Sequence, residues 1–309
     1  MRALILGSGF IGRSLGRELD AHGCSVTLAS RQGRAGGAPW LPLDVTDRGA
    51  YARVLAAVQP DVVVLVHGPS DITWCEDHEE EAVRAHVASA HHLCQEASGC
   101  YKVLISTDNI FSGTEERYDE TCTPEPANAY GRAKATAERV LLHQDPDALI
   151  LRLSLVYGWE DPESTKWLNF FALSVSRLLR GERVRAPADH WNTPVLVDDA
   201  ALVGRLLMTH RRRGVYHLGG PDRVSRVEWA RENARVFGCD PRLVEPTSKA
   251  ESRYACRPTN ACLESERLGQ LAELADVSIA GIVAGAERLK ATMPTSFQNH
   301  RGASTHATD

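Results

Sequence analysis

The chain has 309 residues, of which 43% are hydrophobic and 24% charged, and its formal net charge is −5. This balance predicts no nucleic-acid-binding surface, and no apolar run approaches the ~18 residues needed to span a membrane. The eight cysteines form no Cys-x-x-Cys pair, so no metal site is predicted. We expect a cytoplasmic protein that acts on a small molecule. The histidines on or near one helix are expected to be solvated or hydrogen-bonded in the core: His78, His86, His91 and His92.

The first half of the chain alternates short apolar runs with stretches of helical periodicity. In the first such stretch Ile11, Leu15 and Leu19 repeat every four residues, and Gly23 closes it. Runs that are apolar throughout are typical of parallel strands covered by helices on both faces. The order therefore predicts an α/β protein with a Rossmann doubly wound parallel sheet. Its expected strands are Ala3–Leu6, Ser25–Ala29, Trp40–Leu43, Val62–Val66, Val103–Ser106 and Leu149–Leu153.

The turn between the first strand and the first helix carries the pattern Gly7-x-Gly9-x-x-Gly12. Gly7 allows the tight turn, Gly9 lets the backbone approach a pyrophosphate, and Gly12 lets helix and strand pack closely. The start of the helix offers free N–H groups to the phosphates. The pattern therefore predicts an NAD(P) site, with Phe10 and Ile11 in the same turn.

The end of the second strand bears on the choice between NADPH and NADH. NAD sites usually carry an acidic residue there for the ribose 2′-hydroxyl, whereas this chain has Arg31, with Arg34 nearby. A guanidinium suits a 2′-phosphate, so NADPH is predicted, although stacking of Arg31 on the adenine would permit both cofactors. Asp44, followed by Val45, either belongs to a solvated turn or bonds the adenine amino group.

Tyr130 and Lys134 stand four residues apart, so on a helix they lie on one face, one turn apart. A free tyrosine has a pKa near ~10, and a nearby ammonium brings it toward the working range of a proton carrier. Upstream, a strand ends in Thr107, at the edge where open α/β sheets bind ligands. These positions predict a catalytic site.

The second half of the chain is less regular. It predicts helices over 167–179, 198–208, 224–237 and 279–289, the last with Ser278 as N-cap, and a strand over Val215–Leu218. We expect residues 1–155 to form the dinucleotide-binding domain, joined by segments near 193–220. Residues 156–293 are expected to form mainly a smaller C-terminal α/β substrate-binding domain. The polar tail, 294–309, is predicted to be disordered.

The stretch from Ser106 to Glu138 resembles the extended short-chain dehydrogenase/reductases, and within them the dTDP-4-dehydrorhamnose reductase group. That group reads Ser-Thr-Asp-Tyr-Val-Phe-x-Gly, then Tyr-x-Glu, then Asn-x-Tyr-Gly-x-x-Lys. The resemblance covers about residues 1–290. Further motifs that carry it are Asp44-Val45-Thr46-Asp47, Leu151-Arg152-Leu153-Ser154, Val156-Tyr157-Gly158, Asn169-Phe170, Gly214-Val215-Tyr216-His217-Leu218-Gly219-Gly220 and Arg257-Pro258-Thr259-Asn260-Ala261.

The resemblance implies a role for each matching residue. Tyr130 is implied to donate the proton to the substrate carbonyl, Lys134 to tune it and bind ribose, and Thr107 to orient the reacting oxygen. Ser106 and Gly68 are implied to line the nicotinamide side, and family members are often homodimers. The residues expected to contact the cofactor are Gly7, Gly9, Phe10, Ile11, Gly12, Arg31, Asp44, Val45, His67, Gly68, Ser106, Tyr130 and Lys134.

Departures from the group concentrate on the substrate side. Asn109 stands where the group carries Tyr, Leu155 where it carries Trp, and the Asp-Gln-x-Gly-x-Pro-Thr loop is replaced by residues 189–194. The exit of the fourth strand, His67-Gly68-Pro69-Ser70, also differs. The pattern indicates the same chemistry on a different ligand, a keto group on a nucleotide-linked sugar or related polar metabolite. The expected substrate-binding residues are Thr107, Asp108, Asn109, Leu155, Asn169, Trp191 and Arg257.

Two alternatives to a reductase stay open. A sugar-nucleotide 4-epimerase needs little beyond the Thr/Tyr/Lys set, whereas a 4,6-dehydratase is disfavoured because Asp108 is followed by Asn109 and not by Glu. The other alternative is a non-catalytic NADP-binding subunit like the regulatory β subunit of methionine adenosyltransferase, which resembles the same reductases. The intact Thr107, Tyr130 and Lys134 argue against it.

Overall fold

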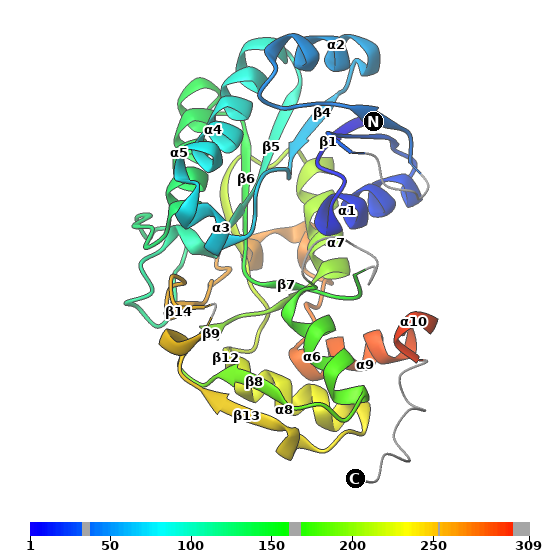
Figure 1. Cartoon of the computed structure of the whole chain (residues 1–309). Coiled ribbons are helices and arrows are strands. Elements are labelled where there is room, and N and C mark those ends of the chain that lie inside the picture. Colours follow the sequence, from blue (N-terminus) through cyan, green and yellow to red (C-terminus); the bar gives the residue numbers. More distant parts are fainter. Residues whose placement is uncertain (33–37, 161–167, 253, 299–309) are drawn as a thin grey trace.

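The computed structural model describes residues 1–32, 38–160, 168–252 and 254–298. Their main sheet has seven strands in the order β11-β6-β5-β4-β1-β2-β3, and every pairing in it is parallel (Figure 1). The predicted doubly wound sheet is therefore confirmed. The strands are β1 (Arg2–Leu6), β2 (Ser25–Ser30), β3 (Trp40–Pro42), β4 (Val62–Leu65), β5 (Tyr101–Thr107), β6 (Leu149–Leu153) and β11 (Gly214–Leu218).

Helices cover both faces of this sheet. The residues of β1 alternate between two cores: Ala3 and Ile5 belong to one, Leu4 and Leu6 to the other, and all four are 0% exposed. This two-sided burial is why the strand is apolar at these positions. One face carries α1 (Phe10–Ala21) and α7 (Val197–Thr209), and the other carries α2 (Arg48–Val58), α4 (Glu79–Glu96) and α5 (Ala129–Gln144), with α3 (Ile72–Asp77) beside α5.

A second lobe follows the carboxyl end of β6 and lies below the sheet in Figure 1. Its core packs Tyr157, Phe171, Trp229 and Phe237 among α6 (Phe170–Leu179), α8 (Arg226–Phe237) and α9 (Ile282–Ala291). Its short strands pair as β7 (Val156–Tyr157) with β10 (Val195–Leu196), β8 (Val184–Pro187) with β13 (Val244–Thr247), and β9 (Trp191–Asn192) with β12 (Val224–Ser225) and β14 (Asn260–Ala261). No described helix is both long and apolar enough to cross a bilayer.

Two expectations about the C-terminal part are wrong. Helix α9 takes Gly281 as its N-cap and not Ser278, because the backbone N–H of Ile282 donates to a carboxylate oxygen of Asp222 at 2.7 Å. The tail is expected to be disordered from residue 294, yet Thr295–Gln298 forms helix α10, whose apolar Phe297 is 2% exposed and packs against Trp159. Residues 299–309 lie outside the described part.

Single 3₁₀ turns occur at Asp108–Ile110 (η1), Pro241–Leu243 (η2), Lys249–Glu251 (η3), Leu268–Gln270 (η4) and Ala272–Leu274 (η5).

Candidate active site

The turn between β1 and α1 has the geometry that a dinucleotide phosphate needs. Gly7 has φ +130°, and a Cβ on Gly12 would lie 2.0 Å from the Gly7 carbonyl oxygen, so helix and turn touch through backbone atoms. Gly9 is the N-cap of α1, no side chain caps the helix there, and a Cβ on Gly9 would meet nothing within 4 Å. The free N–H groups and the open approach therefore fit a pyrophosphate. Ile11 packs against the core, and the Phe10 ring lies against Gly158.

Arg31 and Asp44 lie close together where β2 and β3 end. Arg31 is exposed. Asp44 Oδ1 accepts hydrogen bonds from Thr46 Oγ1 at 2.7 Å and Thr46 N at 2.9 Å, and these bonds, with the charge of Arg31, lower the pKa of the carboxyl group. Val45 accepts from His92 through its carbonyl. Arg34 lies outside the described residues.

Two imidazoles lie at the carboxyl end of β4. Gly68 has φ +117°, and a Cβ there would lie 2.2 Å from His86 Cε1. The His86 ring therefore packs directly against the Gly68 backbone. His86 Nε2 donates to the carbonyl of Pro69 at 3.1 Å, which satisfies it in the core as expected. His67 is held by a serine hydroxyl of α4 at 2.6 Å. Burial lowers the pKa of His67 to about 3 and that of His86 well below its ordinary value, so both rings are neutral.

Thr107, Tyr130 and Lys134 come together at the carboxyl end of β5. Thr107 is the last residue of that strand, and its side chain lies close enough to the Tyr130 phenol to lower the pKa of that phenol slightly; its hydroxyl donates to Asp108 Oδ1 at 3.3 Å and accepts from Asn109 N at 3.2 Å. Lys134 lies one turn further along α5 and donates to the Ile105 carbonyl at 2.6 Å. Burial raises the pKa of Tyr130 above its ordinary value and lowers the pKa of Lys134 to about 8. The His86 ring lies edge-to-face with Tyr130, with 5.7 Å between the centroids.

The start of α5 explains why Tyr130 reaches Thr107. Asn128 is the N-cap: its Oδ1 accepts from Gly131 N at 2.8 Å, and its Nδ2 donates to Asn109 Oδ1 at 3.2 Å and to the Cys256 carbonyl at 3.3 Å. A Cβ on Gly131 would lie 2.0 Å from the Asn109 carbonyl oxygen. A glycine here therefore lets the helix lie directly against η1, which brings the phenol beside the threonine.

A buried charged network, which the sequence does not predict, underlies this site. Glu138, one turn after Lys134, accepts the Ser106 hydroxyl and pairs with Arg152, whose Nη2 lies 2.8 Å from Oε2; the Arg and Glu side chains are 6% and 4% exposed. Arg152 Nη1 is 3.1 Å from His217 Nε2. The Glu138 charge raises the pKa of Lys134 and opposes the effect of burial. The Ser106 hydroxyl is therefore engaged inside the protein by Glu138, and its expected contact with the nicotinamide side stays a prediction.

Two residues expected on the substrate side take part in the packing of the second lobe. Leu155 packs against its core. Asn169 is the N-cap of α6, where Oδ1 accepts from Ala172 N at 3.2 Å and Nδ2 donates to the Gly158 carbonyl at 2.9 Å. The side chain of Asn169 therefore has a structural role, which an asparagine directly before an apolar helix signals in a sequence.

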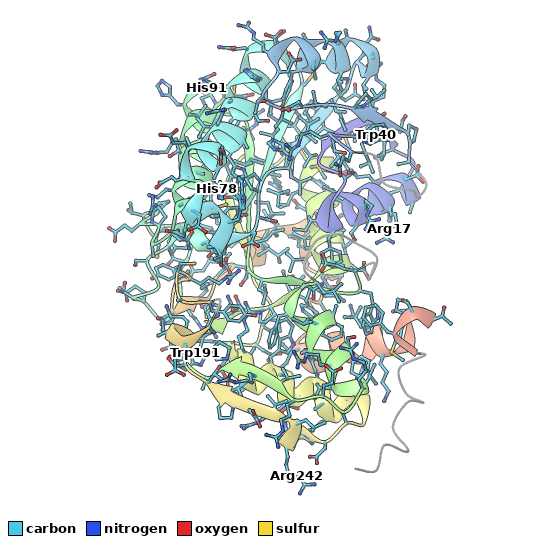
Figure 2. The ribbon with its side chains drawn as sticks, viewed as in Figure 1. Arg17, Trp40, His78, His91, Trp191 and Arg242 are labelled. Carbon is cyan, nitrogen blue, oxygen red and sulfur yellow. The ribbon has the colours of Figure 1, made fainter. Side chains whose placement is uncertain are left out.

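Trp191 lies in the second lobe, on β9 (Figure 2). The Arg223 guanidinium lies 5.0 Å from the centre of the Trp191 ring, and that of Arg257 lies 4.8 Å from the centre of the Tyr254 ring. The pKa of His190 is well below its ordinary value, mainly because the ring is buried and to a smaller extent because positive charges lie nearby. The cations that act on His190 are Arg226, Arg257 and Lys249.

The parallel sheet, the glycine turn and the Thr–Tyr–Lys set define the class of the extended short-chain dehydrogenase/reductases. Within that class the chain belongs to the family described as the RmlD substrate binding domain, whose family model matches residues 1–277. The match confirms the resemblance to sugar-nucleotide reductases that the motifs predict.

Three known proteins illustrate the likeness. The chain is 30% identical to dTDP-4-dehydrorhamnose reductase of Streptomyces griseus over 277 residues, covering 86% of each chain. It is 29% identical to methionine adenosyltransferase 2 subunit beta of Danio rerio over 287 residues, covering 86% of this chain and 84% of that protein. A solved dTDP-4-dehydrorhamnose reductase from Bacillus anthracis, in complex with NADP, shares the fold with a TM-score of 0.79 at 23% identity, covering 95% of this chain and 99% of that one.

Proposed function

We propose that this chain is an NADPH-dependent reductase of a keto group on a nucleotide-linked sugar or a related polar metabolite. The observation that carries the proposal is that Thr107, at the carboxyl end of β5, lies near Tyr130 of α5, with Lys134 one turn further along that helix. A carbonyl oxygen bound there would meet an orienting hydroxyl and a proton donor together.

Each residue has a defined task in that reaction. Bound NADPH supplies the hydride. Tyr130 donates its proton to the carbonyl oxygen as negative charge develops on it, and Thr107 fixes where that oxygen lies. The Lys134 ammonium favours the phenolate that remains, because an opposite charge nearby stabilises it in a buried site. The turn from Gly7 to Gly12 would hold the pyrophosphate.

NADPH is proposed over NADH because of Arg31. It stands, exposed, where an NAD site carries an acidic residue, and a guanidinium can donate two hydrogen bonds to a 2′-phosphate. A family relative solved with NADP supports the choice. The cations of the second lobe, among them Arg223 and Arg257, support a substrate that carries phosphate.

The first experiment follows NADPH absorbance with a panel of nucleotide-linked 4-keto sugars. Tyr130→Phe should lower kcat roughly 10²–10⁴-fold, the usual contribution of a positioned acid. Tyr157→Phe is the matched control, since its buried hydroxyl has no hydrogen-bond partner within the described residues and its loss should leave kcat unchanged. Product formation without net cofactor oxidation would indicate a 4-epimerase instead.

Arg31→Asp tests the cofactor. A hydrogen bond to a charged group contributes about 1.5–3 kcal/mol, so the ratio of kcat/KM for NADPH over NADH should fall at least about tenfold. An unchanged ratio would show that Arg31 does not recognise the 2′-phosphate.

A second candidate function is a regulatory subunit, because methionine adenosyltransferase 2 subunit beta is among the matching relatives. The test mixes this chain with a methionine adenosyltransferase catalytic subunit and measures complex formation and activity. A stable complex that Tyr130→Phe leaves intact, with no reductase activity in the wild type, would favour this function over the reductase.

A further inference from the structure

Glu138 is a buried carboxylate on the helix that carries Tyr130 and Lys134, and the proposed reaction gives it no task. It lies one turn beyond Lys134 on α5, and both residues are 3% exposed. Residues four apart on a helix have their Cβ atoms about 5–6 Å apart on one face. Both side chains also reach the same strand, β5. The Lys134 ammonium donates to the Ile105 carbonyl at 2.6 Å, and Glu138 accepts the hydroxyl of the next residue, Ser106. The carboxylate and the ammonium are therefore neighbours in the buried space between α5 and β5.

A second strand holds the Glu138 carboxylate in place. Arg152 of β6 donates to Glu138 Oε2 from Nη2 at 2.8 Å and from Nε at 3.2 Å, and Arg152 Nη1 lies 3.1 Å from His217 Nε2. His217 Nδ1 lies 3.0 Å from the Tyr118 carbonyl, which can only accept, so Nδ1 carries the hydrogen and Nε2 accepts from Arg152. The carboxylate is thus tied to β5 through Ser106 and to β6 through Arg152, and the fold sets its position relative to the lysine.

Few charged groups act on Lys134. Burial lowers the pKa of Lys134 to about 8, and within the described residues Glu138 is the one group that acts in the opposite direction. The other titratable side chains that face Lys134 are His67, which follows β4, and His86 of α4, and both rings are neutral. Tyr130, one turn before Lys134, becomes negative only after it has given up its proton. Before the reaction, the charge that favours the ammonium is therefore that of Glu138.

We propose that Glu138 is a positioning residue of the reductase, which keeps Lys134 as an ammonium fixed on β5 one turn from the catalytic tyrosine. This inference rests on the proposed function. In that reaction the ammonium favours the phenolate that is left on Tyr130 after its proton has moved to the carbonyl oxygen. A neutral amine in the same place would not. Glu138 acts through Lys134, because its own oxygens are taken up by Ser106 and Arg152.

The first test measures the charge of Lys134 in the full chain and needs no substrate. The chain has five lysines, so with ¹³Cε-labelled lysine the NMR signal absent from Lys134→Met identifies this residue. The pKa of Lys134 should be about 8 in the wild type. In Glu138→Gln that pKa should be lower by at least about 1, because a neighbouring opposite charge has been removed. An unmoved pKa in Glu138→Gln would overturn the proposal.

Two further variants make the titration decisive. Glu138→Gln leaves Arg152 buried without its charge partner, so the double variant with Arg152→Met, which removes both charges, guards against a failure to fold. The pKa of Lys134 should again be lower than in the wild type. Asp145→Asn is the matched control, since Asp145 pairs at 2.7 Å with Lys102, another lysine of β5. It should leave the pKa of Lys134 unchanged, and an equal fall in this control would overturn the assignment to Glu138.

The second test follows kcat against pH with NADPH and a keto sugar. Wild-type kcat should fall as pH rises through the Lys134 pKa of about 8, and in Glu138→Gln the fall should begin at lower pH. With a pKa lower by about 1, the variant should be nearly as fast as the wild type at about pH 6 and roughly tenfold slower at about pH 9. A merely structural role of Glu138 would lower kcat by the same factor at every pH.

The outcomes separate the two proposals. A wild type that oxidises NADPH with a keto sugar, while kcat falls at the same pH in Glu138→Gln, overturns the role of Glu138 and leaves the reductase intact. A wild type that oxidises NADPH with no carbonyl substrate of the panel overturns the reductase and the positioning role with it, whatever the titration of Lys134 shows.

Discussion

Replacing Gly131 by alanine tests whether close contact between α5 and η1 positions the catalytic tyrosine. The new Cβ would lie 2.0 Å from the Asn109 carbonyl oxygen, whereas real Cβ atoms stay at least 3.0 Å from such atoms. The two segments would have to separate by about 1 Å, and overpacking of this kind costs about 1–3 kcal/mol. Alanine regains up to ~1 kcal/mol of helix propensity, so the net loss should be roughly 1–2 kcal/mol.

That loss corresponds to a Tm lower by about 1.5–3 °C for a chain of this size. The separation also moves the Tyr130 phenol away from Thr107, and a displacement of about 1 Å can cost roughly a hundredfold in rate. Thermal unfolding by circular dichroism and kcat with NADPH measure the two effects. Gly16→Ala is the matched control within α1, where the Cβ would meet side chains no closer than 3.5 Å. It should keep full activity and gain stability, and equal behaviour of the two variants would refute the reasoning.

Three further predictions concern groups around the site. Gly68→Ala should weaken NADPH binding, measured by fluorescence titration, because its Cβ meets the His86 ring at 2.2 Å; His86→Ala in the same chain should restore part of the affinity. Glu138→Gln should lower the free energy of unfolding in urea by about 3–5 kcal/mol, since it leaves Arg152 buried without its charge partner, and adding Arg152→Met should recover part of that loss. The pKa of Lys134 is about 8 in the folded chain, below its ordinary 10.5, so the unfolded chain binds the extra proton between these values and stability rises with pH there. Lys134→Met should remove this rise, on the order of 3 kcal/mol in urea unfolding, and a rise that persists in the variant would contradict the assignment.

The parts of the fold that follow a local pattern could be predicted from sequence. The strand β1 is apolar from Ala3 to Leu6 because both its faces are covered, and the spacing of Tyr130 and Lys134 places them on one helix face whatever the rest of the chain does. The approach of Thr107 to Tyr130 follows from the rule that ligands bind at the carboxyl ends of parallel strands.

Contacts between distant parts of the chain could not be predicted. Glu138 pairs with Arg152, 14 residues away, and Arg152 contacts His217, a further 65 residues along. No periodicity in the sequence predicts either pair. His86 shows in the sequence only as one of several histidines on a helix. The His86 ring can lie beside Tyr130 because Gly68 has no side chain that would occupy the same space. Nothing in a single sequence links His86 with Gly68.

Both hydrogens of the Asn128 side-chain amide are used in hydrogen bonds. Its oxygen holds the first turn of α5, and the two hydrogens of its nitrogen reach η1 and the segment around Cys256. Any shift of that segment therefore pulls on the residue from which the tyrosine-bearing helix starts. One side chain therefore links the position of the segment around Cys256 to the start of the helix that carries the phenol.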